Sequence, residues 1–134
     1  MTCIFCQIAK KELPNHTVYE DDAVLAFLDV HPCAKGHTVV IPKKHFEQLS
    51  DLKSKDWDEL MQGVRGALEK VEAVLHPAGV NIGINDRPAA GQMVSHVHWH
   101  IFPRWANDGG SSAHAIIQNG EDIDVAAVAE LFKK

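Results

Sequence analysis

The chain has 134 residues, and at roughly 100–200 residues per domain this length predicts a single domain over residues 1–134. Its 13 basic and 18 acidic residues give a formal net charge of −5, which argues against a general nucleic-acid-binding protein, because such proteins present a basic face. No apolar run approaches the roughly 18–20 residues of a membrane span, and no secretory signal is visible. We therefore expect a cytoplasmic protein with reduced thiols and no membrane or nucleic-acid partner.

β-Branched and alternating apolar residues predict five strands, over residues 17–20, 23–30, 37–41, 80–84 and 94–102. The first two flank a polar turn at residues 20–22, so we expect them to form a hairpin. Between the third and fourth strands, apolar residues recur every three or four positions from Trp57 to Leu75. This spacing predicts one long helix, with Ser54 as its N-cap.

Beyond the fifth strand the composition changes. Residues 105–120 are polar and rich in glycine and serine, which predicts a mobile segment. Apolar residues at helical spacing within residues 124–132 predict a short helix. Strands joined by short connections beside one long helix indicate an α+β fold, with an antiparallel sheet of about five strands, the long helix and the short C-terminal helix.

Three histidines stand at alternate positions: His96, His98 and His100. Alternate side chains of a strand share one face, so we predict a row of imidazoles roughly 7 Å apart, with the intervening residues in apolar packing. The outer two rings would then lie roughly 13 Å apart, too far for both to bind one zinc at about 2.1 Å. Neutral imidazole can instead attack an electrophile or hold an anion. The row therefore predicts a catalytic site rather than a solvated polar surface.

A polar loop at residues 85–91 precedes the row. Gly91 permits close approach of the backbone, and the N–H groups beside it can face a phosphate. The side chains of Asn85 and Gln92 are neutral donors suited to phosphoryl oxygens. We expect a phosphate-binding loop here.

Cys3 and Cys6 have the spacing of one half of a tetrahedral zinc site. The other two ligands must come from elsewhere in the chain, and His45 and His96 are the candidates. Two alternatives remain open, namely buried thiols with nothing bound and a redox pair of the thioredoxin type. We favour a structural zinc, in which case His96 is a structural residue and chelation reduces stability.

Together these segments resemble the histidine triad (HIT) family. Residues 91–102 resemble its motif, in which three histidines alternate with apolar residues, and Pro103 and Arg104 continue it. Upstream blocks match the family pattern in the same order, at residues 3–8, 19–22, 26–29 and 36–45. The N-terminal Cys-x-x-Cys is similar to that of a subgroup with structural zinc.

The resemblance implies a homodimeric hydrolase or nucleotidyl transferase that acts at the α-phosphate of purine nucleotide phosphoramidates or dinucleoside polyphosphates. It implies a covalent nucleotidyl-histidine on His98, with no metal needed for the chemistry. It also implies that His100 binds the phosphate and helps the leaving group depart, and that His37 supports the hydrogen bonding of the triad. A nucleotide-binding regulatory or scaffold protein with slight turnover is the alternative.

The resemblance also implies a set of substrate contacts. The implied residues are Asp29 at the ribose hydroxyls, Asn85 and Gln92 at the phosphate, Gly91 and Val94 as further substrate-binding residues, and Ile4, Phe5, Phe27 and Leu28 along an apolar slot for the purine.

Overall fold

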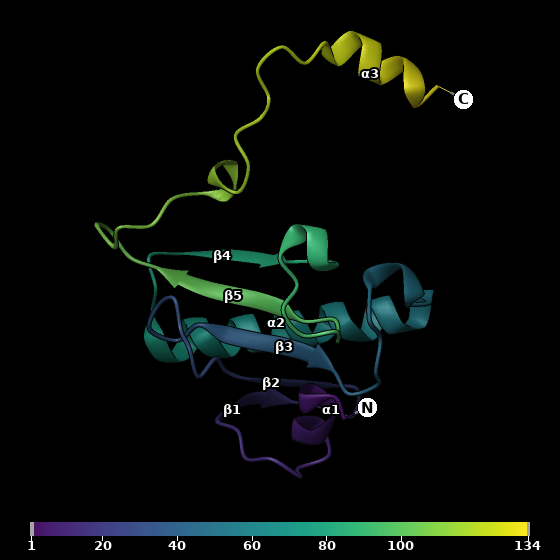
Figure 1. Ribbon diagram of the computed structural model, residues 1–134. Coiled ribbons are helices and arrows are strands. Elements are labelled where there is room, and N and C mark those ends of the chain that lie inside the picture. Colours follow the sequence, from purple (N-terminus) through teal and green to yellow (C-terminus); the bar gives the residue numbers. More distant parts are fainter. Residues whose placement is uncertain (1, 134) are drawn as a thin grey trace.

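The computed structural model describes residues 2–133, and it confirms the predicted α+β fold (Figure 1). Five strands form one sheet in the order β1-β2-β3-β5-β4, with antiparallel neighbours throughout. The strands are β1 (Thr17–Glu20), β2 (Val24–Leu28), β3 (Thr38–Pro42), β4 (Gly79–Ile84) and β5 (Trp99–Arg104). The helices are α1 (Ile4–Ala9), α2 (Ser54–Leu75) and α3 (Val125–Leu131), and single 3₁₀ turns lie at η1 (Leu49–Asp51), η2 (Pro88–Ala90) and η3 (Ala113–Ala115).

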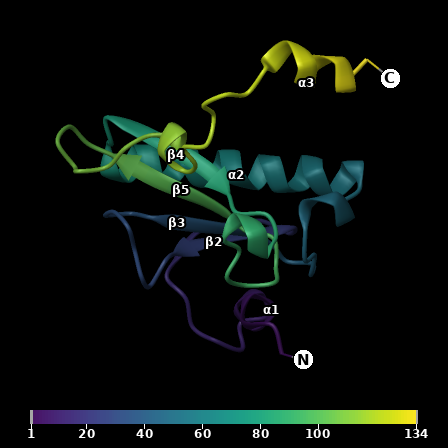
Figure 2. The ribbon, with the colours of Figure 1, turned by 45° about the horizontal axis from the view of Figure 1, so that its top comes forward.

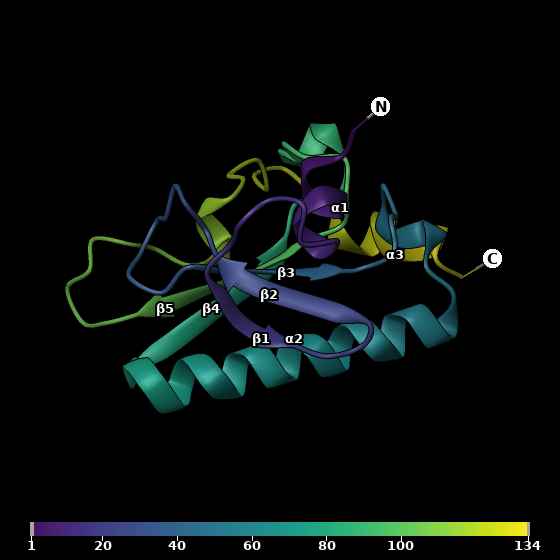
Figure 3. The ribbon, with the colours of Figure 1, turned by 90° about the horizontal axis from the view of Figure 1, so that it is seen from below.

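The long helix α2 packs along one face of the sheet (Figure 3). Its apolar stripe, which includes Leu60, Val64 and Ala67, meets strand residues such as Val24 and Ile101, and all of these side chains are buried. The helix begins one residue earlier than expected, because Lys53 rather than Ser54 is the N-cap. The Asp56 carboxylate accepts the backbone N–H of Lys53 at 3.0 Å.

The short helix α1 lies against the other face, over β2 and β3 (Figure 2). Its buried Ile8 packs with Leu25, Phe27, Val39 and Ile41. We did not predict this helix from the sequence. It covers only part of this face, which leaves the side chains of β5 accessible beside it.

The fifth strand begins at Trp99, and not at residue 94 as predicted. The backbone N–H of Val97 bonds to the Phe46 carbonyl at 2.7 Å, and that of His96 bonds to the Val94 carbonyl at 2.8 Å. These bonds bend the chain out of the sheet before β5. Val97 and Ile101 are nevertheless buried in the α2 core with Trp99 packed against them, as predicted.

After Arg104 the chain leaves the sheet and runs past β4 to α3, which stands apart from the rest of the molecule (Figure 1). The apolar side chains of α3 are exposed, including Val125, Leu131 and the following Phe132. The predicted mobility of residues 105–120 stays a prediction. Within residues 2–133, no helix has the length and apolar character needed to cross a membrane.

Candidate active site

Two of the three alternating histidines, His98 and His100, place their rings side by side, with centroids 5.1 Å apart. Only His100 belongs to β5, so the predicted row within a single strand is wrong. The preceding bend turns the ring of His96 toward the cysteines of the N-terminus. His96 and His98 are both buried, while His100 is half-buried.

The hydrogen bond of His98 determines which of its nitrogens is free. Its Nδ1 lies 2.7 Å from the backbone carbonyl oxygen of His96. A carbonyl oxygen can only accept, so Nδ1 carries the hydrogen and donates it. In the neutral ring Nε2 then holds a free lone pair, which is the form that a nucleophile needs.

A second chain of hydrogen bonds determines the tautomer of His100. The backbone N–H of Cys33 donates to Nδ1 of His37 at 3.1 Å, so the neutral His37 ring carries its hydrogen on Nε2. That Nε2 lies 2.9 Å from Nδ1 of His100, which therefore accepts. His100 must keep its own hydrogen on Nε2, where it is a donor.

The pairing of β3 with β5 brings these two rings together, because Thr38 and Ile101 are register partners and place His37 close to His100. Asp29, which directly follows β2, has its carboxylate 3.6 Å from Nε2 of His37. A cavity of about 380 Å³ lies beside this pair, lined by Leu28, Asp29, Pro32, Cys33, Ala34, Lys35, Gly36 and His37. The predicted ribose contact, Asp29, thus faces a space that His37 also lines.

Burial keeps these histidines neutral. The pKa of His100 is lowered to about 4, chiefly by burial and in smaller part by the neighbouring His98 and His37 rings, while Asp29 acts in the opposite direction. Burial also lowers the pKa of His98 and of His37, against the opposing effects of the His96 carbonyl on His98 and of Asp29 on both. At neutral pH the free nitrogen of His98 is therefore unprotonated.

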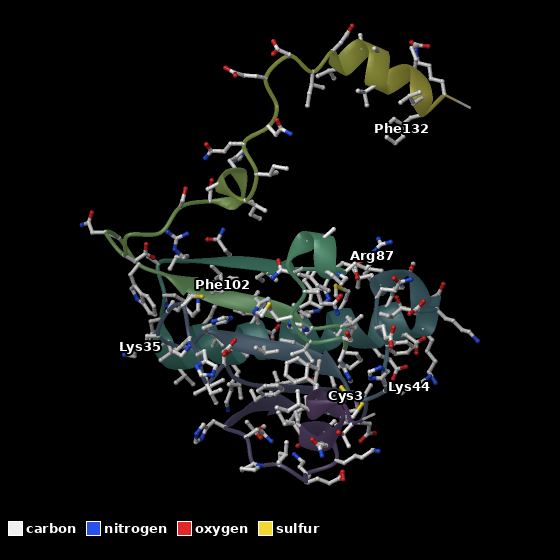
Figure 4. The ribbon with its side chains drawn as sticks, viewed as in Figure 1. Cys3, Lys35, Lys44, Arg87, Phe102 and Phe132 are labelled. Atoms are coloured by element: carbon white, nitrogen blue, oxygen red, sulfur yellow. The ribbon has the colours of Figure 1, made fainter. Side chains whose placement is uncertain are left out.

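Sequence reasoning missed Phe102, which forms a wall of the site on β5 (Figure 4). Its ring stacks on His100 with centroids 5.4 Å apart and an interplanar angle of 15°, and it lies 4.4 Å from the His37 ring. The signal was present in the sequence, because residues 98, 100 and 102 continue the same alternation. Residue 102 is the next position on the face that carries His100, so an aromatic ring there is expected to lie beside the His100 ring.

The loop before the histidines forms a tight turn. Gln92 uses its side chain within the loop: its oxygen accepts the Arg87 N–H at 2.6 Å, and its nitrogen donates to the carbonyls of Glu47 and Val94. Gly91 has a φ of +96°, which favours glycine, and the Asn85 side chain lies against it. Of the two amides expected to face a phosphate, Asn85 is the one whose side chain is exposed.

The four residues of the expected zinc site converge. Their ligand atoms lie within 4.8 Å of one another, in the set Cys3, Cys6, His45 and His96. The Nδ1 atoms of the two histidines are 3.2 Å apart, and Cys6 Sγ is 3.3 Å from His45 Nδ1 and 3.6 Å from His96 Nδ1. A tetrahedral zinc separates such ligand atoms by roughly 3.3–3.8 Å, given its bond lengths of about 2.0–2.3 Å.

The hydrogen bonding of His96 also fits a metal. Its Nε2 lies 2.8 Å from the Pro42 carbonyl and so carries the hydrogen, which leaves the Nδ1 lone pair facing the cysteines. Both thiols are partly exposed, which disfavours the buried-thiol alternative, and the two converging imidazoles disfavour a thioredoxin-type pair. These four residues suit a tetrahedral metal ion.

Asp29, His37 and His100 also bring ligand-type atoms together, but their hydrogen bonding does not suit a metal. A metal on Nε2 of His37 would require the hydrogen to move to Nδ1. That atom already faces the N–H donor of Cys33. The same contact that determines the tautomer therefore opposes metal binding here.

The residues expected along the purine slot lie on α1 and β2. Phe5 and Phe27 pack with ring centroids 5.7 Å apart, and Phe27 is buried. Ile4 and Leu28 are 48% and 37% exposed, so their side chains remain available to a ligand.

The HIT domain family matches residues 10–107 of this chain. An uncharacterized HIT-like protein of Methanocaldococcus jannaschii is 48% identical over 135 residues, which cover 98% of each chain. The adenosine 5′-monophosphoramidase of Schizosaccharomyces pombe is 38% identical over 104 residues, covering 78% of this chain and 75% of its own. The crystal structure of a zinc-bound histidine triad family protein of Mycobacterium smegmatis aligns with a TM-score of 0.76 at 34% identity, over 98% of this chain and 96% of that one. The chain therefore belongs to the HIT family.

Proposed function

We propose that this protein hydrolyses purine nucleotide phosphoramidates or dinucleoside polyphosphates at the α-phosphate, with His98 as the nucleophile. The observation that carries the proposal is the 2.7 Å hydrogen bond from Nδ1 of His98 to the His96 carbonyl, which leaves Nε2 free to attack. The similarity to a relative named adenosine 5′-monophosphoramidase supports a nucleotide phosphoramidate as one substrate class.

In the first step, the Nε2 lone pair of His98 forms a bond to the α-phosphorus while the bond from phosphorus to the leaving group breaks. The electron pair of the broken bond departs with the amine or nucleotide, and the nucleoside monophosphate remains on His98. An amine leaving group takes up a proton from the solvent as it departs. Water then attacks the same phosphorus and returns a proton to the solvent, the phosphorus–Nε2 bond breaks, and the free monophosphate and neutral His98 are regenerated.

His100 supports this chemistry as a hydrogen-bond donor. Its Nε2–H is fixed in place before substrate arrives, because Nδ1 is occupied by His37, and it can meet the charge that develops on a phosphoryl or leaving-group oxygen. His37 is an orienting residue rather than a proton relay. If it gave up its Nε2 hydrogen, its ring would become an anion, since Nδ1 already accepts from Cys33.

The test is turnover of adenosine phosphoramidate and diadenosine polyphosphates by the wild-type protein and by His98→Ala. We expect the substitution to abolish turnover, and we expect a nucleotidyl adduct on wild-type His98 to be trapped by rapid acid quench and mass spectrometry. His16→Ala is the matched control, because this histidine is exposed in the loop before β1. Equal rates in wild type and His98→Ala would contradict the mechanism.

The same panel separates the enzyme from the alternative of a regulatory or scaffold protein. Such a protein would bind purine nucleotides tightly, while its turnover would stay slight on every substrate and would not depend on His98. Substrates with amine and nucleotide leaving groups should be run side by side. Met93, which follows Gln92 in the loop before the histidines, is 91% exposed and has no acidic proton to give to a departing amine.

We also propose that the Cys3, Cys6, His45 and His96 cluster holds a structural zinc. Bonds from zinc to these four side chains would link the N-terminal helix to the loop before β5. No chemical step of the proposed mechanism requires the metal. Metal analysis of purified, unsupplemented protein should find about one zinc per chain. A markedly substoichiometric content would contradict this assignment.

We propose that the protein forms a homodimer in which the β4 strands of the two copies pair. β4 is an edge of the sheet, and its Ile82, although on the same face as buried Ile101, is 40% exposed. Val74 in the last turn of α2 is 62% exposed. An antiparallel pairing of β4 with β4 of a second copy would extend the sheet and cover this apolar surface.

A further inference from the structure

The helix α1 lies between the metal-type cluster and the proposed nucleophile. It begins directly after Cys3 and contains Cys6, and Phe5 stands between these two cysteines. The Phe5 ring is nearly perpendicular to the His98 ring, with centroids 5.0 Å apart, and it has the same relation to the His96 ring at 5.9 Å. One aromatic side chain therefore contacts both a member of the cluster and the nucleophile.

His98 depends on such contacts more than a strand residue would. The pairing of β3 with β5 begins at Trp99, so the sheet fixes the backbone of His100 but stops short of His98. The His98 ring is held by its hydrogen bond to the His96 carbonyl, and it packs between His100 and Phe5. Of the two side chains that pack against His98, Phe5 is the one that comes from another part of the chain, the helix α1.

We propose that Phe5 is a positioning residue for His98, through which the Cys3/Cys6/His45/His96 cluster controls the direction of the nucleophile's lone pair. The inference deepens the proposed function and rests on it. The cluster holds α1, α1 holds Phe5, and Phe5 limits the tilt of the imidazole. In-line attack on phosphorus is sensitive to such tilt, since a misplacement of about 1 Å can reduce a rate by about 100-fold.

The family resemblance implies a second role for Phe5, as a contact to the purine. The two roles give different kinetics. A contact to the base alone affects KM for nucleotides and has no effect on a substrate without a base. A positioning role lowers kcat for every substrate that uses His98, including ribose 5-phosphoramidate.

The experiment compares Phe5→Leu, which removes the ring, with Phe5→Tyr, which keeps it. We expect Phe5→Leu to lower kcat on the order of tenfold for both adenosine phosphoramidate and ribose 5-phosphoramidate, and Phe5→Tyr to retain most of the rate. Ile8→Val is the matched control on the same helix: it removes one methyl group from the buried cluster against which Phe5 packs, and it leaves the Phe5 ring in place. This variant should lose some stability and keep kcat.

The link to the cluster is tested by a double-mutant cycle with Cys6→Ser, which removes one of the four converging ligand atoms. If the cluster acts through Phe5, the Phe5→Leu substitution should cost much less in the Cys6→Ser background than in the wild type. The ¹⁵N resonances of the His98 ring provide a readout that does not depend on turnover. They should be sharp in wild type and Phe5→Tyr, and broadened or shifted in Phe5→Leu and Cys6→Ser.

The proposal would be overturned by an unchanged kcat in Phe5→Leu, by a loss confined to KM for substrates with a base, or by additive effects of the two substitutions. An equal loss of kcat in Ile8→Val would also overturn it, because loosening of α1 would then suffice without the aromatic contact. The proposed function is judged separately. It fails if wild type and His98→Ala have the same rate, whereas the proposal fails when wild type is active and Phe5→Leu keeps its kcat and its His98 resonances.

Discussion

Two backbone groups decide what the histidines of this site can do. The His96 carbonyl takes the hydrogen of His98 and frees its Nε2, and the Cys33 N–H fixes His37, which in turn fixes His100 as a donor. The tautomers that the proposed nucleophile and donor need are thus fixed before a substrate binds, as preorganised catalysis requires. The sequence does not show which backbone groups these are, because a backbone group has the same chemistry at every position and only the fold brings it to a ring.

The burial of His100 predicts a pH dependence of stability. An unfolded chain protonates this residue near its ordinary pKa of 6.5, while the folded chain does so only near 4. Between these values the unfolded state binds more protons, so the free energy of unfolding should fall as the pH is lowered from 6.5 toward 4. Urea unfolding at a series of pH values measures this slope.

His100→Asn should make this dependence shallower than in the wild type, by close to one proton. Comparing the slopes of the two proteins cancels the protonation of the Cys/His cluster, which both share. His16→Asn, a change at an exposed histidine, should leave the slope unaltered. If the free energy of unfolding depends on pH equally in wild type and His100→Asn, then burial does not lower the pKa of His100.

At the level of secondary structure, the elements with a clear period were predictable and those held by side-chain chemistry were not. The stripe of α2 and the strands β1 to β4 follow from spacing, and the predicted boundaries differ from the observed ones by two residues or fewer. The six-residue α1 is too short for a period to be recognised, and its position depends on Cys3 and Cys6 meeting histidines far along the chain. Alternation alone also predicted a strand through His96, which its bond to Pro42 and its approach to the cysteines prevent.

Gly63 lies where α2 packs closely against the sheet, so we expect a larger side chain at this position to destabilise the fold. A Cβ atom there would lie 2.4 Å from Cγ1 of the fully buried Val24. Gly63→Ala should therefore destabilise the fold by about 1–3 kcal/mol, despite the better helix propensity of alanine, because neither element can withdraw without opening the core. Urea unfolding compares it with Gly79→Ala, a position where an added Cβ would meet nothing within 4 Å.

The double variant Gly63→Ala/Val24→Ala tests whether the steric contact with Val24 causes the loss of stability. If the steric contact is responsible, the double variant should be more stable than the sum of the two single effects predicts. Additive effects would mean that the added methyl group is accommodated without meeting Val24, and would contradict the packing argument.

In the whole molecule, the candidate active site lies on one face of the sheet, and the exposed apolar residues of the proposed dimer contact lie near the β4 edge. The histidines, Asp29 and α1 lie on the face opposite α2, whereas β4 has one free edge and exposed apolar side chains near it. The chain after Arg104 passes on the β4 side of the sheet (Figure 1). A protein that is monomeric in solution would leave this edge open to uncontrolled strand pairing, which natural sheets generally avoid.

The proposed β4 pairing predicts that Ile82→Lys weakens dimerisation. A lysine at this position would bring two uncompensated charges into an apolar contact across the two-fold axis, so the dissociation constant should rise by roughly tenfold or more. Sedimentation equilibrium over a range of protein concentrations measures it, and circular dichroism should show that the fold is retained. Val30→Lys is the matched control, because Val30 is an apolar residue that is 76% exposed in the loop after β2. A wild-type protein that sediments as a single chain, or an Ile82→Lys variant that dimerises as tightly as the wild type, would show that β4 is not the interface.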